Sequence, residues 1–157
     1  MKIDLRPIGF VRGGRTEPTN DDWDRVTARI ELDTDWLSCE AILGLDSFSH
    51  AEVIYYFHKN DPETIVTTTR HPRNNMNWPL TGIFAQRVHS RPNMLGITTC
   101  HILGVDGTSV HVRGLDAIDG SPVIDIKPYL SGFAPRGEVR EPDWAGELMS
   151  DYWRIQD

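Results

Sequence analysis

The stretch GIFAQRVHSRPNMLG, Gly82 to Gly96, contains the features around which we interpret the rest of the chain. Alternation over its first half predicts a strand, with Ile83, Ala85 and Arg87 on one face. Pro92 fixes its own φ and moves the preceding residue toward an extended conformation, so the Arg91-Pro92-Asn93 segment predicts a rigid corner. The stretch therefore predicts a strand, then a binding loop, then a second strand.

Positive charge is concentrated around this stretch. Between Glu63 and Asp106 the chain has no Asp or Glu but has four arginines, Arg70, Arg73, Arg87 and Arg91. The segment carries a formal charge of +4, and because the whole chain carries −7, the remainder carries −11. A planar guanidinium binds carboxylates and phosphates through two parallel hydrogen bonds, so the segment is a candidate anion-binding surface. The alternative is that each arginine forms a solvated surface pair with the acidic remainder.

Length and composition are ordinary for a globular protein. A chain of 157 residues can bury its own core, and we expect one domain over residues 1–157. No apolar run approaches the length of a membrane span, and Met1 to Gly9 lacks the pattern of a secretion signal, so we expect a cytoplasmic protein without a membrane partner.

Cys39 and Cys100 are far apart in the sequence, and we expect both to be buried thiols. The acidic total argues against binding nucleic acid with the whole surface, so we expect no DNA partner, whereas a local basic patch is compatible with it.

Turn residues and apolar periodicity divide the chain into short elements. We expect strands over residues 3–11, 28–32, 51–57, 65–70, 97–103, 109–115 and 122–127. A helix is expected over residues 35–43, with a buried stripe of Trp36, Cys39, Ile42 and Leu43. A closing helix is expected over residues 143–154, with Trp144, Leu148 and Tyr152 along one face. Residues 71–80 form a connection of unusual length, which is typical of a functional loop.

The second half of the chain has the pattern of an antiparallel sheet. Asp106-Gly107 and Asp119-Gly120 are dipeptides preferred in tight hairpins. Alternation predicts that Val110 and Val112 face the core, and that Ser109, His111 and Arg113 point away from it. On the next strand it predicts that Ile124 and Ile126 face the core, and that Asp125, Lys127 and Tyr129 point away from it. The pattern predicts a mainly β fold, an antiparallel or mixed β-barrel with a few peripheral helices, including a C-terminal helix.

Candidate site residues follow the central strand. His58 and Lys59 stand at its end, where a pocket could open, and the alternative is that His58 bonds a neighbouring backbone carbonyl. The common glycine-rich nucleotide motifs, HExxH and GxSxG are absent. The spacing of the six histidines matches no helical or hairpin ligand set, so we expect no metal site.

Several motifs in order resemble the TrmO/TsaA-like family. They are GIFAQR at Gly82 to Arg87, RPN at Arg91 to Asn93 with Gly96, LD at Leu115 and Asp116, DGSPVIDIKPY at Asp119 to Tyr129, RPIG at Arg6 to Gly9, and GLDSFSH at Gly44 to His50. The resemblance covers nearly the whole chain up to about Pro135.

The resemblance implies a single-sheet β-barrel that binds S-adenosylmethionine beside a homodimer interface. It also implies N6-methylation of threonylcarbamoyladenosine next to the tRNA anticodon. Carried over by position, cofactor contacts are expected at His58, Lys59, Arg87, Ile97, Arg113, Gly114, Leu115 and Asp116. Substrate contacts are expected at Arg91, Asn93, Asp125, Lys127 and Tyr129, and the sequence identifies no catalytic base. An arginine suits the carboxylate of this cofactor, and a carboxylate such as Asp116 suits its ribose hydroxyls.

Two other functions stay open. The loop around the RPN motif departs from the family pattern at Val88-His89-Ser90 and at Met94-Leu95. A chain with an altered loop and an acidic exterior could bind S-adenosylmethionine without transferring its methyl group. It could also methylate a small molecule in place of tRNA.

Overall fold

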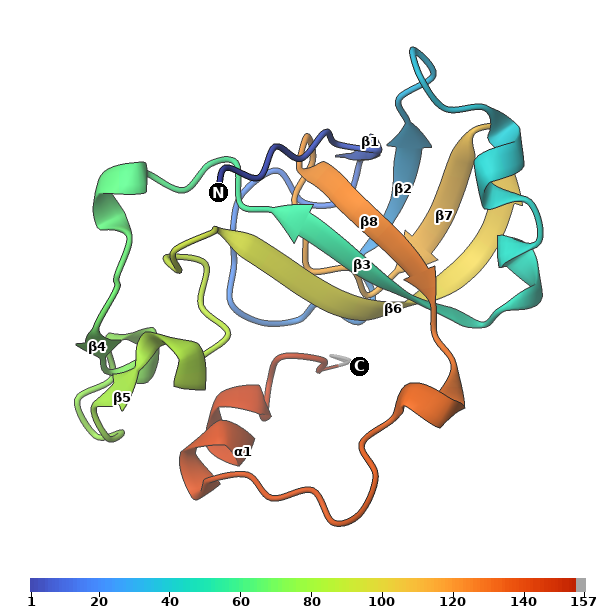
Figure 1. The fold of residues 1–157 in the computed structure, drawn as a ribbon. Coiled ribbons are helices and arrows are strands. Elements are labelled where there is room, and N and C mark those ends of the chain that lie inside the picture. The colour runs from blue at the N-terminus through green and yellow to red at the C-terminus, as the bar shows by residue number, and fades with distance from the viewer. Residues whose placement is uncertain (155–157) are drawn as a thin grey trace.

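Six strands form a closed barrel in the computed structural model, which describes residues 1–154 (Figure 1). The strands of the barrel are β1 (Gly9–Arg12), β2 (Thr27–Leu32), β3 (His50–Tyr56), β6 (Leu95–Asp106), β7 (Ser109–Arg113) and β8 (Pro122–Pro128). Their order around the barrel is β1, β2, β7, β6, β3 and β8, and every neighbouring pair is antiparallel. The predicted mainly β barrel is therefore confirmed, and it is antiparallel throughout.

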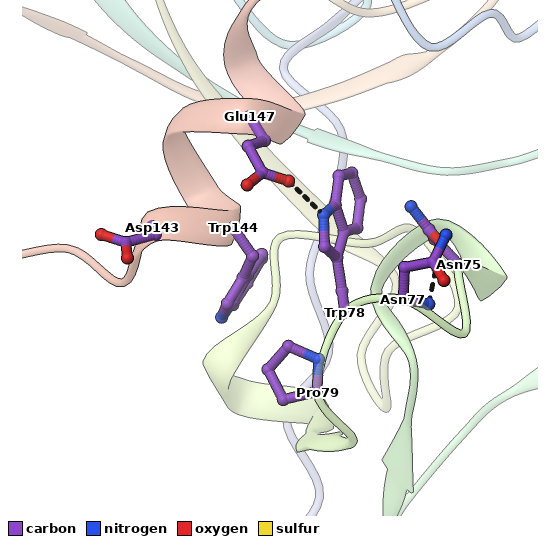
Figure 2. A pocket seen from close by; sticks show the side chains of 7 residues that line it. All are labelled: Asn75, Asn77, Trp78, Pro79, Asp143, Trp144 and Glu147. Atoms are coloured by element: carbon purple, nitrogen blue, oxygen red, sulfur yellow. Dashed lines mark hydrogen bonds between the residues drawn. The ribbon is translucent and has the colours of Figure 1, made fainter.

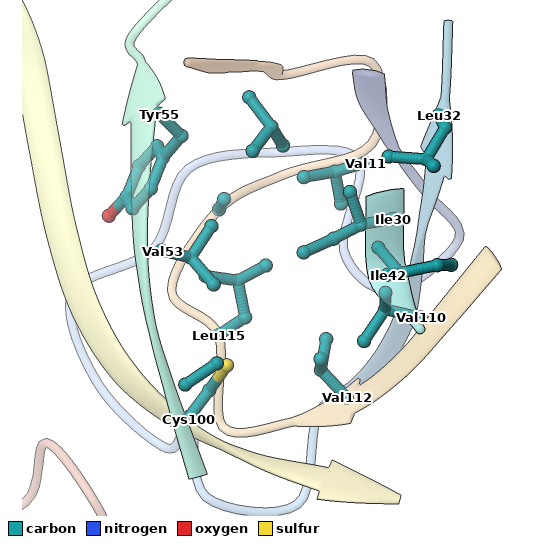
Figure 3. Packing of buried hydrophobic residues seen from close by; sticks show 13 residues of the cluster. Val11, Ile30, Leu32, Ile42, Val53, Tyr55, Cys100, Val110, Val112 and Leu115 are labelled. Atoms are coloured by element: carbon teal, nitrogen blue, oxygen red, sulfur yellow. The ribbon is translucent and has the colours of Figure 1, made fainter. Parts of the chain in front are cut away.

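The core fills the barrel with inward-pointing side chains. Burial alternates along β3 and along the first half of β6, as expected for strands with one face on the core. On β7 the predicted faces are confirmed, because Val110 and Val112 are fully buried while Ser109, His111 and Arg113 are not. Figure 3 shows these valines packed among branched side chains from other strands, including Val11, Ile30 and Val53.

A β-bulge changes the alternation on β8. The pairing of β3 with β8 shifts between Ile54 and Tyr55, so that Val123 and Ile126, three residues apart, both contact the core. The expectation that Ile124 faces the core is therefore wrong, and Val123 is the fully buried residue instead.

The two DG dipeptides have different roles. Asp106-Gly107 joins β6 to β7, which pair directly, as predicted. The hairpin predicted at Asp119-Gly120 is wrong, because β8 pairs with β1 and β3 and not with β7. The segment before β8 instead crosses the barrel end and places Leu115, Ala117 and Ile118 in its interior. These apolar side chains cover the core at that end.

The stretch from Gly82 to Gly96 is not a strand over its first half. Only Thr81–Gly82 is extended, as β5, and it pairs with β4 (Thr69–Arg70) in a separate two-stranded ribbon. A 3₁₀ turn follows at Ile83–Ala85, which buries Ile83 and Gln86 on the same side. The spacing of three matches the period of a 3₁₀ turn and explains why alternation misled the prediction. The predicted corner is confirmed, since the Met94 N–H donates to the Arg91 carbonyl.

The helix predicted over residues 35–43 is also wrong. Ser38 is extended, and its hydroxyl accepts from the Glu40 N–H, so only a 3₁₀ turn forms at Cys39–Ile42. Of the predicted buried stripe only Ile42 is buried, whereas Trp36, Cys39 and Leu43 are exposed.

The C-terminal helix is present but short. α1 spans Asp143–Met149, and Trp144 and Leu148 are only half-buried on its surface. Tyr152 lies beyond the helix end, on a segment that returns to the barrel. None of the helices in residues 1–154 has the length and apolarity needed to cross a lipid bilayer.

Gly96 provides a test of the packing inside the barrel. A Cβ atom at Gly96 would lie 2.5 Å from Cζ of Tyr55, whose ring is 2% exposed. We expect Gly96→Ala to lower the free energy of unfolding by about 1 to 3 kcal/mol, because the ring has to move. Urea denaturation measures the change. Gly104→Ala on the same strand is the control, since nothing lies within 4 Å of its Cβ position. An equal loss of unfolding free energy in both variants would contradict this packing.

The two thiols should differ in reactivity. Cys39 is exposed, whereas Cys100 is buried, and burial raises the pKa of its thiol to about 12. Because the thiolate is the reactive form, we expect the native protein to release one equivalent of thionitrobenzoate from Ellman's reagent and the denatured protein two. Cys39→Ser should abolish the native signal. Rapid release of two equivalents from the folded chain would show that Cys100 is accessible.

Candidate functional site

Three connections leave the barrel at the same end. Because neighbouring strands are antiparallel, the β1–β2 connection, the long β3–β6 connection and the segment from β7 to β8 all emerge there. They are tied together by hydrogen bonds, in which the Lys59 ammonium donates to the Thr16 carbonyl at 2.7 Å and the Gly13 N–H donates to Asp119 at 2.8 Å. All eight expected cofactor residues lie on these connections or on the strand residues next to them.

Asp116 is the centre of the polar groups at this end. Its Oδ1 accepts hydrogen bonds from the Tyr55 hydroxyl, at 2.5 Å, and from the Thr98 hydroxyl. Its Oδ2 accepts from the Tyr152 hydroxyl. The three donors come from β3, from β6 and from the C-terminal segment. A carboxylate fixed in this way has a defined orientation, and Oδ2, with one donor, retains capacity for a further hydroxyl.

The two tyrosines that bind Asp116 remain protonated donors. Burial, followed by the charge of Asp116, raises the pKa of Tyr55 well above its usual value. The same two causes raise the pKa of Tyr152, although the charges of Arg87 and Arg73 act in the opposite direction. Neither phenol can therefore serve as a general base near neutral pH.

Arg87 and Ile97 are brought together, as expected. The exposed guanidinium of Arg87 donates to the Ile97 carbonyl at 2.6 Å. The Ile97 side chain is 42% exposed, while Thr98, the next residue on β6, points inward to Asp116. The Arg87 guanidinium and the Asp116 carboxylate are therefore bound by consecutive residues of β6, Ile97 and Thr98.

His58 and Lys59 lie at the same barrel end, where they contact the segment before β8 and the β1–β2 connection. His58 Nδ1 is 3.3 Å from the Ser121 hydroxyl, and its Nε2 would lie 3.5 Å from a Cβ at Gly120. Burial first, and the charge of Lys59 second, lower the pKa of His58, so its imidazole is neutral near pH 7. The alternative that His58 bonds a backbone carbonyl is not observed, because its partner is a hydroxyl. The Lys59 ammonium pairs with Glu17 at 3.0 Å.

The remaining expected cofactor residues differ in what they can offer a ligand. The Leu115 side chain is 1% exposed and belongs to the core, so only its backbone is available. Gly114 has a φ of +78°, which other residues adopt only with strain. The Nε of Arg113 is buried and has no hydrogen-bond partner among residues 1–154. An unpaired buried donor of this kind fits an acceptor such as a carboxylate.

The expected substrate residues fall into two separate groups. Arg91 donates to the Gln86 carbonyl at 3.0 Å, and Asn93 is exposed on the same turn. Asp125 and Lys127 form an ion pair of 2.7 Å on β8, and Tyr129 follows that strand. No hydrogen bond or ion pair within the described part of the chain joins the two groups, and their substrate role stays a prediction.

The basic segment keeps most of its charge. Arg73 pairs with Asp21 at 2.7 Å. Within residues 1–154, Arg70, Arg87 and Arg91 form no ion pair and donate to neutral oxygens. The alternative of solvated surface pairs is thus correct for Arg73 alone. The other three guanidiniums have no carboxylate partner within the described residues.

Two surface grooves adjoin the C-terminal segment. The larger, about 610 Å³, lies between the loop at residues 75–79 and α1 and contains the two carboxylates Asp143 and Glu147 (Figure 2). Trp78 donates to Glu147 across it at 2.7 Å. The smaller groove, about 290 Å³, is lined by Asp24, His50, Thr99, His101, Arg113, Gly114 and Trp153. We assign the site to the barrel end beside the smaller groove, because the larger one has no cation to hold an anionic group.

Three members of the Asp116 cluster were missed by the sequence reasoning. Tyr55 and Thr98 occupy inward positions of neighbouring strands, where a buried hydroxyl requires a partner, and this signal could have identified them. No comparable signal marks Tyr152, since its contact depends on the path of the chain after β8. Among residues 1–154 no group of three or more His, Cys, Asp or Glu side chains could hold a metal ion.

Comparison with known proteins identifies relatives over most of the chain. The model of the tRNA-methyltransferase O N-terminal domain matches residues 16–134. A human tRNA (adenine(37)-N6)-methyltransferase is 31% identical over 143 residues, which are 87% of this chain and 32% of that protein. A "Probable S-adenosyl-L-methionine-binding protein" of Methanothermobacter thermautotrophicus is 36% identical over 133 residues, 82% of this chain and 91% of that protein.

Solved structures agree with the sequence comparison. The crystal structure of TrmO from Pseudomonas aeruginosa has a TM-score of 0.69 at 26% identity, over 89% of this chain and 62% of that one. The chain spans about a third of the length of its human relative. On the match over residues 16–134, this chain belongs to the family of the tRNA-methyltransferase O N-terminal domain.

Proposed function

We propose that this chain is an S-adenosylmethionine-dependent methyltransferase that N6-methylates threonylcarbamoyladenosine beside the tRNA anticodon. The observation that carries the proposal is that the oriented Asp116 carboxylate and the Arg87 guanidinium, which has no ion pair within residues 1–154, are bound by consecutive residues of β6, Thr98 and Ile97. The pair matches a molecule with hydroxyls at one end and a carboxylate at the other. Family membership and the names of the human and archaeal relatives support the same cofactor and reaction.

The residues present fit this cofactor in chemical type. Asp116 would accept from a ribose hydroxyl, and Arg87 or the unpaired Nε of Arg113 would bind the carboxylate. Gly114 and the Leu115 backbone, the Ile97 side chain, and His58 with Lys59 would complete the contacts. Because His58 is neutral near pH 7, it would add no positive charge to the site.

The chain has to do little chemistry of its own. S-adenosylmethionine supplies a methyl group that its sulfonium already activates. The protein holds the two reactants in line and excludes water, and such positioning can lower a barrier by up to about 7 to 11 kcal/mol.

The basic segment suits an RNA substrate. Arg70, Arg87 and Arg91 keep their charge on a chain with an overall charge of −7, and phosphate contacts supply much of the affinity for nucleic acids. We infer that Arg91 and Asn93 contact the tRNA, and that Asp125, Lys127 and Tyr129 contact it at a second point. We also propose that the protein forms a single domain, is cytoplasmic and acts as a homodimer.

A binding module that transfers nothing is the second candidate. It is favoured by the archaeal relative, which this chain covers over 91% of its length and whose name gives only binding. Release of S-adenosylhomocysteine with RNA distinguishes the two candidates, because a binding module would release none.

Methyl transfer can be measured directly. We expect the protein to incorporate label from methyl-labelled S-adenosylmethionine into unfractionated tRNA that carries threonylcarbamoyladenosine. Asp116→Asn should reduce incorporation about tenfold or more, since the carboxylate loses its charge. Label in a low-mass fraction would instead indicate a small-molecule substrate. Incorporation into no fraction, despite cofactor binding, would favour the binding module.

Arg87→Ala tests the carboxylate contact. We expect the variant to bind S-adenosylmethionine more weakly by more than about 1.5 kcal/mol, as for the loss of a charge-assisted hydrogen bond. Isothermal titration calorimetry gives the affinity. Arg29→Ala is the control, because Arg29 pairs with Glu31 on β2, away from the site. Equal affinities of the Arg87 variant and the unmodified protein would exclude this role.

A further inference from the structure

The chain returns to the barrel after α1 and covers the candidate site. The Asp22 N–H donates to the Asp151 carbonyl at 3.1 Å, and the Trp23 N–H donates to the Tyr152 carbonyl at 2.9 Å. Trp153 lies above Gly114, where a Cβ atom would be 3.9 Å from its ring. The segment Asp151 to Trp153 therefore contacts the same Gly114-to-Asp116 residues that the proposed cofactor would use.

Tyr152 is the residue of this segment that contacts the site directly. Its half-buried side chain donates to Oδ2 of Asp116, and its ring contacts Trp153 edge to face, with centroids 4.9 Å apart. The charges of Arg87 and Arg73 also act on its hydroxyl. Tyr152 thus binds the Asp116 carboxylate directly.

The two oxygens of Asp116 are held by different parts of the chain. Oδ1 is bound by Tyr55 and Thr98, which belong to the barrel. Among residues 1–154, Oδ2 has a hydrogen bond only from Tyr152. Without it, a ligand hydroxyl would have to orient Oδ2 itself, at a cost in affinity.

We propose that Tyr152 is a positioning residue of the cofactor site, which holds Oδ2 of Asp116 in the orientation that accepts a ligand hydroxyl. The inference rests on the proposed function, because it takes S-adenosylmethionine as the ligand. It adds a residue from outside the segment that the family model matches, which ends at residue 134. The C-terminal segment is then part of the binding site.

A double-mutant cycle tests the proposal. The four proteins are the unmodified chain, Tyr152→Phe, Asp116→Asn and the double variant, and calorimetry gives their Kd for S-adenosylmethionine. Loss of one hydroxyl that acts through Asp116 should raise Kd roughly threefold to tenfold in Tyr152→Phe. In the Asp116→Asn background the same change should alter Kd less than twofold, because the carboxylate that Tyr152 orients is gone.

Controls separate positioning from folding. Tyr56→Phe removes a hydroxyl whose partner is the Met94 sulfur at 3.8 Å, and it should leave Kd unchanged. Thermal unfolding of each variant shows whether it is folded. A purely structural role of Tyr152 would raise Kd by the same factor in both backgrounds, which would overturn the proposal.

The remaining outcomes also decide the question. Tighter binding by Tyr152→Phe would mean that the C-terminal segment competes with the ligand, and this would overturn a positioning role. An unchanged Kd would do the same while leaving the proposed function intact. If the unmodified chain fails to bind S-adenosylmethionine, the proposed function fails, and the inference fails with it.

Discussion

The Asp116 carboxylate is the interaction on which the arrangement of the site depends. It accepts hydroxyls from β3, from β6 and from the C-terminal segment, so it joins parts of the chain that are far apart in sequence. A carboxylate beside the barrel interior requires such partners, because burying charge without hydrogen bonds is costly. The same bonds fix the direction of a group that suits a sugar hydroxyl.

The position of Asp116 depends in turn on its neighbours in the sequence. Gly114 adopts a left-handed conformation, and the side chains of Leu115 and Ala117 enter the core on either side of Asp116. This alternation anchors the segment at the barrel end while its carboxylate stays at the edge. The LD motif therefore combines a packing residue with a polar one.

Sequence patterns predicted most of the barrel because its strands alternate. The strand expected over residues 51–57 is present as β3, alternation on β7 gave the correct faces, and Asp106-Gly107 marked a true hairpin. Predictions from alternation and helical periodicity failed where a local turn or a side-chain hydrogen bond to the backbone decides the conformation. Ile83 and Gln86 are three residues apart and both buried, which suits a 3₁₀ turn and not a strand. The Ser38 hydroxyl accepts from the backbone of the following turn, which ends the expected helix.

The positions of the expected site residues were predictable to a similar degree. Arg87, Ile97 and Asp116 followed from the resemblance, and the structure places them at one end of the barrel. Tyr152 could not be predicted, since its contact with Asp116 is a tertiary contact of a segment with no local pattern that specifies its path.

The way the barrel closes has a consequence for synthesis and folding. The last seam joins β1 to β8, where Gly9 pairs with Val123 across more than a hundred intervening residues. Such non-local pairing is slow, because the entropy of a long loop has to be lost before the contact forms. On the ribosome, β1 emerges early but lacks one of its two neighbours until β8 has been translated. Its open edge is then available to other strands, which makes this nascent intermediate a candidate for chaperone protection.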